Sequence, residues 1–287
     1  MKAWFIKNKY FISDNFLKLE KLVIESAKRN NICLTIFDNI DVIKVLSEKK
    51  YEKPDFVLFW DKDIKLASFI ESEGIKVFNS SNSIKICDDK SLTYLSLLKE
   101  NIKQPKTIFS PLIYYHSLAN EETFISFVTS HLRFPFVYKE CVGSFGKQVY
   151  LINDVKEFKD RIVSSGINPF FCQEFIKNSF GKDLRLYVVG DKVVGSMKRE
   201  NFSGDFRANI ELGGIGSKYD ANENQKNMAI IAVKKLKLNF AGVDILFGEN
   251  DEPILCEVNS NAYFVGINKV VDAHIEDYIF DYILGIL

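Results

Sequence analysis

Phe240-Ala-Gly-Val-Asp-Ile-Leu-Phe247 and Ile254-Leu-Cys-Glu-Val-Asn259 are two apolar runs on either side of an acidic turn. This pattern predicts the two strands of a hairpin. Asp244 and Glu257 lie at equal distances from the middle of the turn, so they should face each other with Cβ atoms about 4.5–5.5 Å apart. Side chains alternate along a strand with period two, which places Asn259 on the same face as Glu257. Three oxygen-bearing side chains are therefore expected to converge.

The two facing carboxylates need a positive partner. They would repel each other in a half-buried sheet, and an unpaired buried charge is costly. Oxygen ligands favour magnesium or manganese, so Asp244, Glu257 and Asn259 are candidate ligands of a divalent cation. In the alternative interpretation Asp244 is an ordinary carboxylate at a strand end and the other two lie on a solvated face, because edge hairpins often carry charges.

Length and composition indicate a globular protein with more than one domain. The chain has 287 residues, of which 47% are hydrophobic and 26% charged, and these fractions are near globular averages. At about 150 residues per domain the length favours about two domains. The net charge is +0, so no overall field would attract nucleic acid or an anionic membrane. We expect neither as a partner.

Cysteine and histidine usage favours a cytoplasmic protein without a zinc site. The five cysteines are odd in number and lack C-x-x-C spacing, which is typical of reduced thiols in the cytosol. His116, His131 and His274 lack the spacing of zinc ligands. The N-terminal apolar stretch is too short for a signal peptide, and no run of about 18 apolar residues occurs.

Strand and helix patterns divide the chain into three predicted domains, 1–87, 88–176 and 177–287. The first alternates short strands with amphipathic helices, which implies an open, mostly parallel α/β layer. Its predicted strands are residues 3–6, 33–37, 56–60 and 75–78. The second is predicted to contain a helix at 92–98 and strands at 136–140, 148–152 and 170–174. The third is predicted to contain strands at 184–189 and 192–197, a polar loop at 198–209, a helix at 222–237, the hairpin and a closing helix at 267–285.

A glycine-containing turn joins two predicted strands of the second region. In Val142-Gly-Ser-Phe-Gly-Lys147 backbone N–H groups could approach a phosphate, although a plain hairpin turn is the alternative. It is not a P-loop, because Gly143 and Gly146 enclose two residues instead of four. Lys139, in the strand before the turn, could reach the same phosphate or face solvent. The chain also lacks the G-x-G-x-x-G of dinucleotide enzymes and the G-x-S-x-G of nucleophile-elbow hydrolases.

The polar loop 198–209 is rich in hydrogen-bond donors. Arg199, Arg207 and Asn209 gather there, and guanidinium groups suit phosphate or carboxylate oxygens. Loops of this composition are often merely solvated, but the predicted cation site nearby favours a binding role.

These motifs together resemble the ATP-grasp ligases, and more narrowly the RimK-like branch, which joins glutamate or other amino acids to peptide or protein carboxylates. The resemblance covers nearly the whole chain, and several motifs in order are more specific than any one. It rests on Ile86-Cys-Asp-Asp-Lys90, Gln173-Glu-Phe-Ile176, Gly181-Lys-Asp-Leu-Arg185, Val188-Val-Gly-Asp-Lys-Val-Val194, Gly204-Asp-Phe-Arg-Ala-Asn209, and Asp244 with Glu257-Val-Asn259.

The resemblance implies an ATP-grasp fold of the α/β (α+β) class. An N-terminal open parallel layer would precede two α+β subdomains that clamp ATP between antiparallel sheets. Two Mg²⁺ or Mn²⁺ ions would be held by Asp244, Glu257 and Asn259. The implied ATP contacts are Lys90 and Lys139 at the phosphates, Gly143, Ser144 and Gly146 in the loop over them, Glu174, Phe175 and Ile176 at the adenine, Asp183 on the ribose side, and Arg207 with Asn209 at the terminal phosphate.

The implied reaction forms an amide or peptide bond. A substrate carboxylate takes the γ-phosphoryl group to give an acyl phosphate, an amine attacks it, and ADP and phosphate are released. Arg207 and Arg185 would stabilise the oxyanion formed in the attack. The implied substrates are small amino acids or peptides, or the tail of a protein or precursor peptide, and a homo-oligomer is possible.

Two alternatives remain beside this interpretation. One is a peptide maturase of the same fold that closes ester or amide links between side chains of a precursor, and the other is an ATP-binding module without catalysis. The chain also departs from the family pattern. It has Ser260-Asn-Ala-Tyr-Phe264 where the family usually has Ser-Pro-Gly, and Leu212 where a basic residue often precedes the paired glycines. These departures leave the identity of the substrate open.

Overall fold

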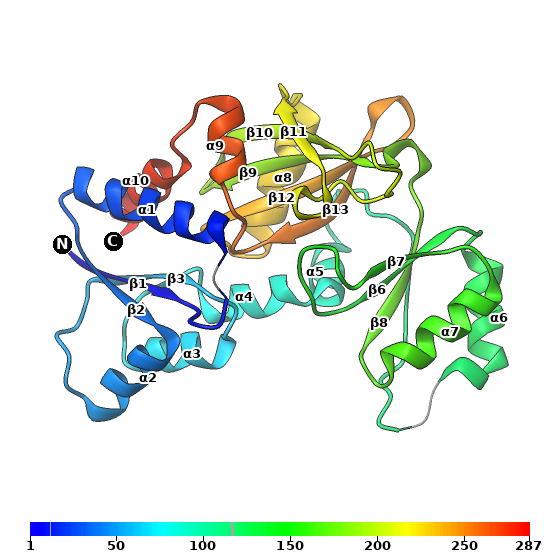
Figure 1. The fold of residues 1–287 in the computed structure, drawn as a ribbon, viewed down its shortest axis with the longest axis horizontal. Coiled ribbons are helices and arrows are strands. Elements are labelled where there is room, and N and C mark those ends of the chain that lie inside the picture. Colours follow the sequence, from blue (N-terminus) through cyan, green and yellow to red (C-terminus); the bar gives the residue numbers. More distant parts are fainter. Residues whose placement is uncertain (12, 116–117) are drawn as a thin grey trace.

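The computed structural model describes residues 1–11, 13–115 and 118–287, so His116 lies outside the described residues. Three sheets follow one another along the chain. In Figure 1 the first and second lie at opposite sides of the molecule, with the third above the space between them. None of the helices in the described ranges has the length and apolar character that crossing a bilayer requires.

The first sheet confirms the predicted open parallel layer. Its strand order is β2-β1-β3-β4, and every neighbouring pair is parallel. The strands are β1 (Lys2–Lys7), β2 (Cys33–Asp38), β3 (Phe56–Trp60) and β4 (Val77–Phe78). The helices are α1 (Asp14–Arg29), α2 (Asn39–Glu48), α3 (Ile64–Ser72) and α4 (Ser81–Asp88). Helix α1 begins at Asp14, where the side chain of Ser13 caps it by accepting a hydrogen bond from the Phe16 backbone N–H at 3.2 Å.

The second sheet is antiparallel and has the order β5-β8-β6-β7. Its strands are β5 (Thr107–Phe109), β6 (Phe136–Glu140), β7 (Val149–Ile152) and β8 (Phe170–Glu174). The helices that cover it are α6 (Glu122–His131) and α7 (Val155–Ser165). Helix α5 (Lys90–Leu97) lies between this sheet and the third, since Tyr94 packs against Phe109 of β5 and Leu97 is buried in the core of the third sheet. The glycine-containing turn connects β6 to β7, as the sequence predicts.

The third sheet is also antiparallel and has the order β11-β10-β9-β12-β13. Its strands are β9 (Lys182–Val189), β10 (Lys192–Glu200), β11 (Ile215–Lys218), β12 (Phe240–Phe247) and β13 (Pro253–Asn259). The helices of this part are α8 (Glu223–Lys235), α9 (Val265–Val271) and α10 (Ile275–Ile286). The predicted polar loop starts too early, because β10 continues to Glu200. The domain limits at 87/88 and 176/177 stay a proposal.

The predicted closing helix at 267–285 is wrong as a single helix. The helical conformation is interrupted at Asp272, which has a left-handed backbone with φ of 52° and ψ of 48°. Asn268 bridges the break. Its amide donates to Glu276 Oε2 at 2.6 Å, and its Oδ1 accepts from the Ile275 backbone N–H at 3.2 Å. The break allows α10 to lie beside α1 (Figure 1).

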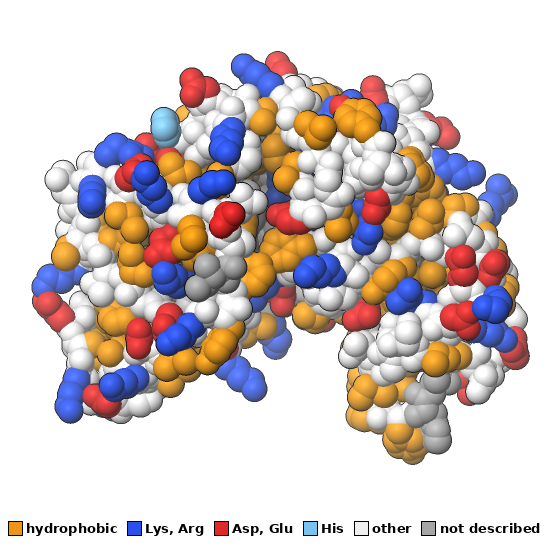
Figure 2. Space-filling view, in the orientation of Figure 1, with side chains coloured by type: hydrophobic (Ala, Val, Ile, Leu, Met, Phe, Trp, Pro, Cys, Tyr) orange, Lys and Arg blue, Asp and Glu red, His pale blue; other side chains and the backbone are white. Residues whose placement is uncertain are grey.

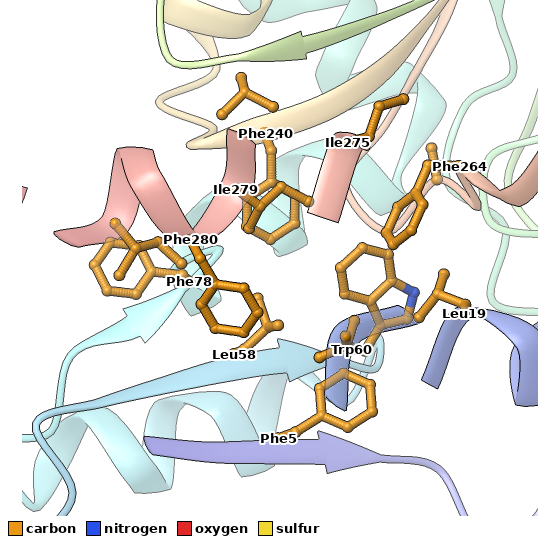
Figure 3. Packing of buried hydrophobic residues seen from close by; sticks show 14 of the residues in the cluster. Phe5, Leu19, Leu58, Trp60, Phe78, Phe240, Phe264, Ile275, Ile279 and Phe280 are labelled. Atoms are coloured by element: carbon orange, nitrogen blue, oxygen red, sulfur yellow. The ribbon is translucent and has the colours of Figure 1, made fainter. Parts of the chain in front are cut away.

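The first and third sheets share one aromatic core. Trp60 at the end of β3 stacks on Phe240 of β12, with ring centroids 5.6 Å apart and planes 10° apart. Phe264 meets Trp60 edge-on at 5.7 Å, and Phe280 of α10 packs against Phe56 at 6.4 Å. Figure 3 shows Trp60, Phe240, Phe264 and Phe280 between the two sheets. The N-terminal layer is thereby fixed against the strand that carries Asp244.

Asn79 adds a buried polar contact between the same two parts. The residue is fully buried. Its amide donates to the carbonyls of Phe240 at 2.9 Å and Ser260 at 3.0 Å, and its Oδ1 accepts from the Asn239 backbone N–H at 2.6 Å. One amide thus satisfies backbone groups at the start of β12 and just after β13.

Asn79→Ala should lower the free energy of unfolding by about 3 kcal/mol, because several buried backbone groups lose their partner at once. Urea denaturation followed by circular dichroism measures this change. Asn224→Ala, on an exposed position of α8, should change it by less than about 0.5 kcal/mol. Equal effects of the two substitutions would contradict a structural role for Asn79.

Candidate active site

Asp244 pairs with Glu257 across β12 and β13, which confirms the predicted register. A β-bulge lies beside this pair. The next pair toward the turn is Ile245 with Leu255, so Cys256 is passed over. If the pairing of residues 245–247 continued without a bulge, Asp244 would face Cys256. The bulge therefore places the two carboxylates opposite each other.

The positive partners of Asp244 in this structure are two arginines. Asp244 is 4% exposed. Arg185 binds both of its oxygens, with Nη2 at 2.7 Å from Oδ2, and Arg199 Nη2 lies 3.1 Å from Oδ2. Asn259 Nδ2 is 3.4 Å from the same oxygen. Burial alone would raise the pKa of Asp244, but the two guanidinium groups outweigh it and lower the pKa to about 2. The group is therefore an ionised oxygen donor at neutral pH.

Lys90 connects Glu257 to the glycine turn. Its Nζ lies 3.5 Å from Glu257 Oε1 and donates to the Gly143 carbonyl at 2.7 Å. Lys90 also lines a small recess beside Cys256 and Glu257. A cation predicted to reach ATP phosphates thus lies next to a predicted metal ligand.

Arg199 belongs to this site in a way the sequence did not indicate. It lies in β10, not in a loop, and is 3% exposed. Its Nε and Nη2 donate to the Asp183 carboxylate at 2.7 and 2.6 Å. A regular hairpin about the turn 190–191 would pair Asp183 with Lys198, but an irregularity at 193–195 shifts the register by one residue and pairs Asp183 with Arg199. Only the strand pattern before Arg199 hinted that β10 continues.

Asp183 lines the same cavity as the predicted ATP contacts. Both of its oxygens accept from Arg199. Its implied contact on the ribose side stays a prediction, and the structure already gives the carboxylate a full partner.

Two neighbouring cavities contain most of the predicted site residues. The first is lined by Lys139, Gly146, Glu174, Phe175, Ile176, Asp183, Arg207, Asn209, Asp244 and Glu257, among others. The second, of about 440 Å³, is lined by Ser144, Arg185, Asn209, Asp244, Glu257 and Asn259, among others. Asp244 and Glu257 line both cavities and thus lie in the wall between them. At this wall a chemical group could be transferred from a ligand in one cavity to a ligand in the other. Figure 2 shows the surface hollowed between the N-terminal part and the tip of the second part.

The first cavity is narrow in this structure. Its volume is about 90 Å³, below the roughly 300–1,000 Å³ of typical ligand pockets. Arg207 contributes to this closure, because its Nη1 donates to the Gly146 carbonyl at 2.6 Å and so holds the glycine turn against the loop after β10. Entry of a nucleotide requires the turn to move away.

Asp205 fixes the orientation of Arg207. Its two oxygens accept from Arg207 Nε at 3.0 Å and Nη2 at 2.7 Å, and Oδ1 also accepts from the Arg207 backbone N–H at 2.8 Å. The fork directs Nη1 toward the glycine turn. A guanidinium held in this way loses little conformational entropy when it binds an anion.

Asp205→Asn should lower the turnover rate of this site about tenfold, because Arg207 loses its fixed orientation without being removed. Steady-state kinetics, with a thermal melt to verify folding, measures the effect. Asp160→Asn, on the exposed face of α7, is the matched control. A turnover rate of Asp205→Asn within a factor of about two of wild type would contradict this role.

Known proteins that are similar in sequence to this chain carry the names of ligases and synthases. Residues 87–283 match the model of the RimK-like ATP-grasp domain. The chain is 35% identical over 217 residues to a probable alpha-L-glutamate ligase of Shewanella sp., covering 74% of this chain and 68% of that protein. It is 29% identical over 262 residues to N-acetylaspartylglutamate synthase A of Homo sapiens, covering 90% of this chain and 63% of that protein.

A solved structure confirms the predicted fold. The D-alanine–D-alanine ligase of Bacillus anthracis complexed with ATP superposes with a TM-score of 0.74, over 99% of this chain and 96% of that chain, at 18% sequence identity. At this identity the likeness concerns the ATP-grasp fold alone.

Proposed function

Since this chain belongs to the RimK-like ATP-grasp family and is an ATP-dependent carboxylate–amine ligase, we propose that L-glutamate is its amine substrate. Glutamate occurs in the names of both relatives described above. The second substrate would be a small carboxylic acid or the carboxylate of a peptide.

Asp244, Glu257 and Asn259 are proposed to hold two divalent ions. The donor set fits, since its three members offer only oxygen ligands to a cation and two of them are carboxylates. Arg185 and Arg199 now neutralise Asp244 and would share it with the ions. When bound, Mg²⁺ would neutralise charge on the phosphates of ATP.

The remaining ATP contacts follow the first cavity. Lys90, Lys139 and the glycine turn 143–146 would bind phosphates, and the backbone of 174–176 would hold the adenine. Support comes from Lys139, which is 8% exposed on β6 and lines the cavity. A lysine buried to this degree needs an anionic partner, and a phosphate supplies it.

The chemical steps take place at the wall between the cavities. A carboxylate oxygen in the second cavity attacks the γ-phosphorus, the bond to the β,γ-bridging oxygen breaks, and ADP leaves. The glutamate amine then attacks the acyl phosphate, loses a proton, and expels phosphate to leave an amide. Arg207, held by Asp205, and Arg185 would stabilise the negative charge that develops on the oxygens.

Asn261 supports an amine substrate in the second cavity. Its amide donates to the Asp61 carbonyl at 2.6 Å, which leaves Oδ1 as a buried acceptor that has no donor within the described ranges. The residue lines the second cavity, at the position where the chain departs from the usual Ser-Pro-Gly. The oxygen has almost no accessible surface, so an ammonium or amine N–H would satisfy it only after the side chain turns toward the cavity.

The single observation that carries the proposed active site is the pairing of Asp244 with Glu257 at the wall between the two cavities, whereas glutamate as the substrate rests on the names of the two relatives. The test is magnesium-dependent ADP release with L-glutamate and a pool of N-acetylaspartate, citrate and acidic peptides. Mass spectrometry should find a product whose mass is the sum of both substrates minus water. ADP release stimulated equally by other amino acids, without glutamate in any product, would refute glutamate as the substrate.

Partners beyond the substrates, a homo-oligomer and a cytoplasmic location stay predictions of the sequence. Size-exclusion chromatography with light scattering decides the oligomeric state.

A further inference from the structure

Each residue of the turn 143–146 is held by a contact from outside the second sheet. The Gly143 carbonyl accepts from Lys90 at 2.7 Å, and the Gly146 carbonyl accepts from Arg207 at 2.6 Å. Ser144 Oγ accepts from Lys62 Nζ at 3.0 Å, and Lys62 is also ion-paired with Asp88. Lys62 follows β3, so this contact ties the turn to the N-terminal part.

Phe145, at the tip of this turn, packs between the other two parts of the molecule. Its ring stacks on Phe11 with centroids 5.6 Å apart and planes 17° apart. On the C-terminal side it meets Tyr263 at 6.3 Å, and Tyr263 in turn packs against Phe16 of α1 at 6.2 Å. Phe145 and Tyr263 both line the second cavity.

The backbone of Phe145 is itself unusual. Its φ is 60°, a left-handed conformation that bulky side chains seldom adopt and glycine adopts freely. A cost of this kind persists only where surrounding contacts hold the residue in place. The Phe11 and Tyr263 rings are such contacts.

The contacts of the turn fall into two groups when ATP binds. Lys90 and Arg207 are the residues proposed to meet phosphates, so a nucleotide would compete for their contacts with Gly143 and Gly146. Phosphates do not compete for the stacking of Phe145. With nucleotide bound, the aromatic contacts of Phe145, together with the hydrogen bond from Lys62 to Ser144, would therefore hold the turn over the substrate cavity.

We propose that Phe145 is a positioning residue that seals the second cavity by docking between Phe11 and Tyr263. This inference rests on the proposed function, because the seal would protect the acyl phosphate from water until the amine attacks. Water that reached the acyl phosphate would regenerate the carboxylate and release phosphate, so ATP would be consumed without product.

The first test measures the docking and needs no substrate. Amide hydrogen exchange over residues 141–149, with MgATP present, should be about fivefold faster in Phe145→Ala and in Phe11→Ala than in wild type. Phe127→Ala is the matched control, since Phe127 is 49% exposed on α6 and Phe11 is 45% exposed. Unchanged exchange in both Phe145→Ala and Phe11→Ala would overturn the inference.

The second test measures the seal. With the glutamate substrate pair, product formed per ADP released should fall about threefold in Phe145→Ala. A fall in kcat with product per ADP unchanged would mean that Phe145 has only a structural role, and would overturn the seal. If the wild type makes no glutamate product, the proposed substrate is wrong, whereas the exchange measurement still decides the docking.

Discussion

Glu257→Gln should lower product formation at least about a hundredfold, because it replaces the charged side chain of a proposed metal ligand with a neutral amide of the same size. The fold should persist, since Glu257 is half-buried and its ion pair with Lys90, at 3.5 Å, lies at the edge of a cavity. Magnesium-dependent ADP release and product mass measure activity, and a thermal melt measures the fold.

Glu249→Gln provides the matched control for this substitution. It lies in the acidic turn of the same hairpin and is exposed, so its loss of charge should leave turnover within about a factor of two. Raising the magnesium concentration should restore part of the activity of Glu257→Gln if the defect is weak metal binding. A fully active Glu257→Gln would exclude the proposed cation site.

Arg199→Met should lower the free energy of unfolding by about 3–5 kcal/mol, the usual range when one partner of a buried ion pair is removed. The substitution keeps much of the apolar volume but leaves Asp183 buried without its two donors, at 2.7 and 2.6 Å. Asp244 keeps Arg185 and is affected less. Urea denaturation measures the change.

A second substitution separates charge from packing at this position. Asp183→Asn in the Arg199→Met background should recover part of the lost stability, because it removes the unpaired buried charge. Arg133→Met, at an exposed site after α6, should change stability by less than about 0.5 kcal/mol. A double variant no more stable than Arg199→Met would show that packing dominates.

Local patterns sufficed to predict the parts of the fold whose partners lie close in sequence. The alternation of apolar runs with amphipathic segments predicted the parallel first sheet, and the turn symmetry predicted the Asp244–Glu257 pair. That symmetry succeeded only because the hairpin carries a bulge at Cys256. The same counting about the turn 190–191 would have paired Asp183 with the wrong residue.

Contacts between distant segments could not be predicted from local patterns. Arg199 meets Asp244 only because β9 lies between β10 and β12 in one sheet. Asn79 finds its partners about 160 and 181 residues further along the chain. The position of Asp244 in the cavity wall depends on both sets of contacts. The sequence therefore predicted a set of site residues, most of which line the two cavities, while the ion network that supports Asp244 required the structure.

The molecule has two folding units, because the aromatic core around Trp60 includes two of its three sheets and leaves out the other. This core joins the first sheet to the third, whereas the second sheet packs its own core from residues 119–172. On heating, the first and third sheets should melt together in one cooperative transition, and the second can open in a step of its own. The hairpin that carries Asp244 and Glu257 thus belongs to the rigid base. The glycine turn belongs to the part that can swing away to admit ATP without loosening that base.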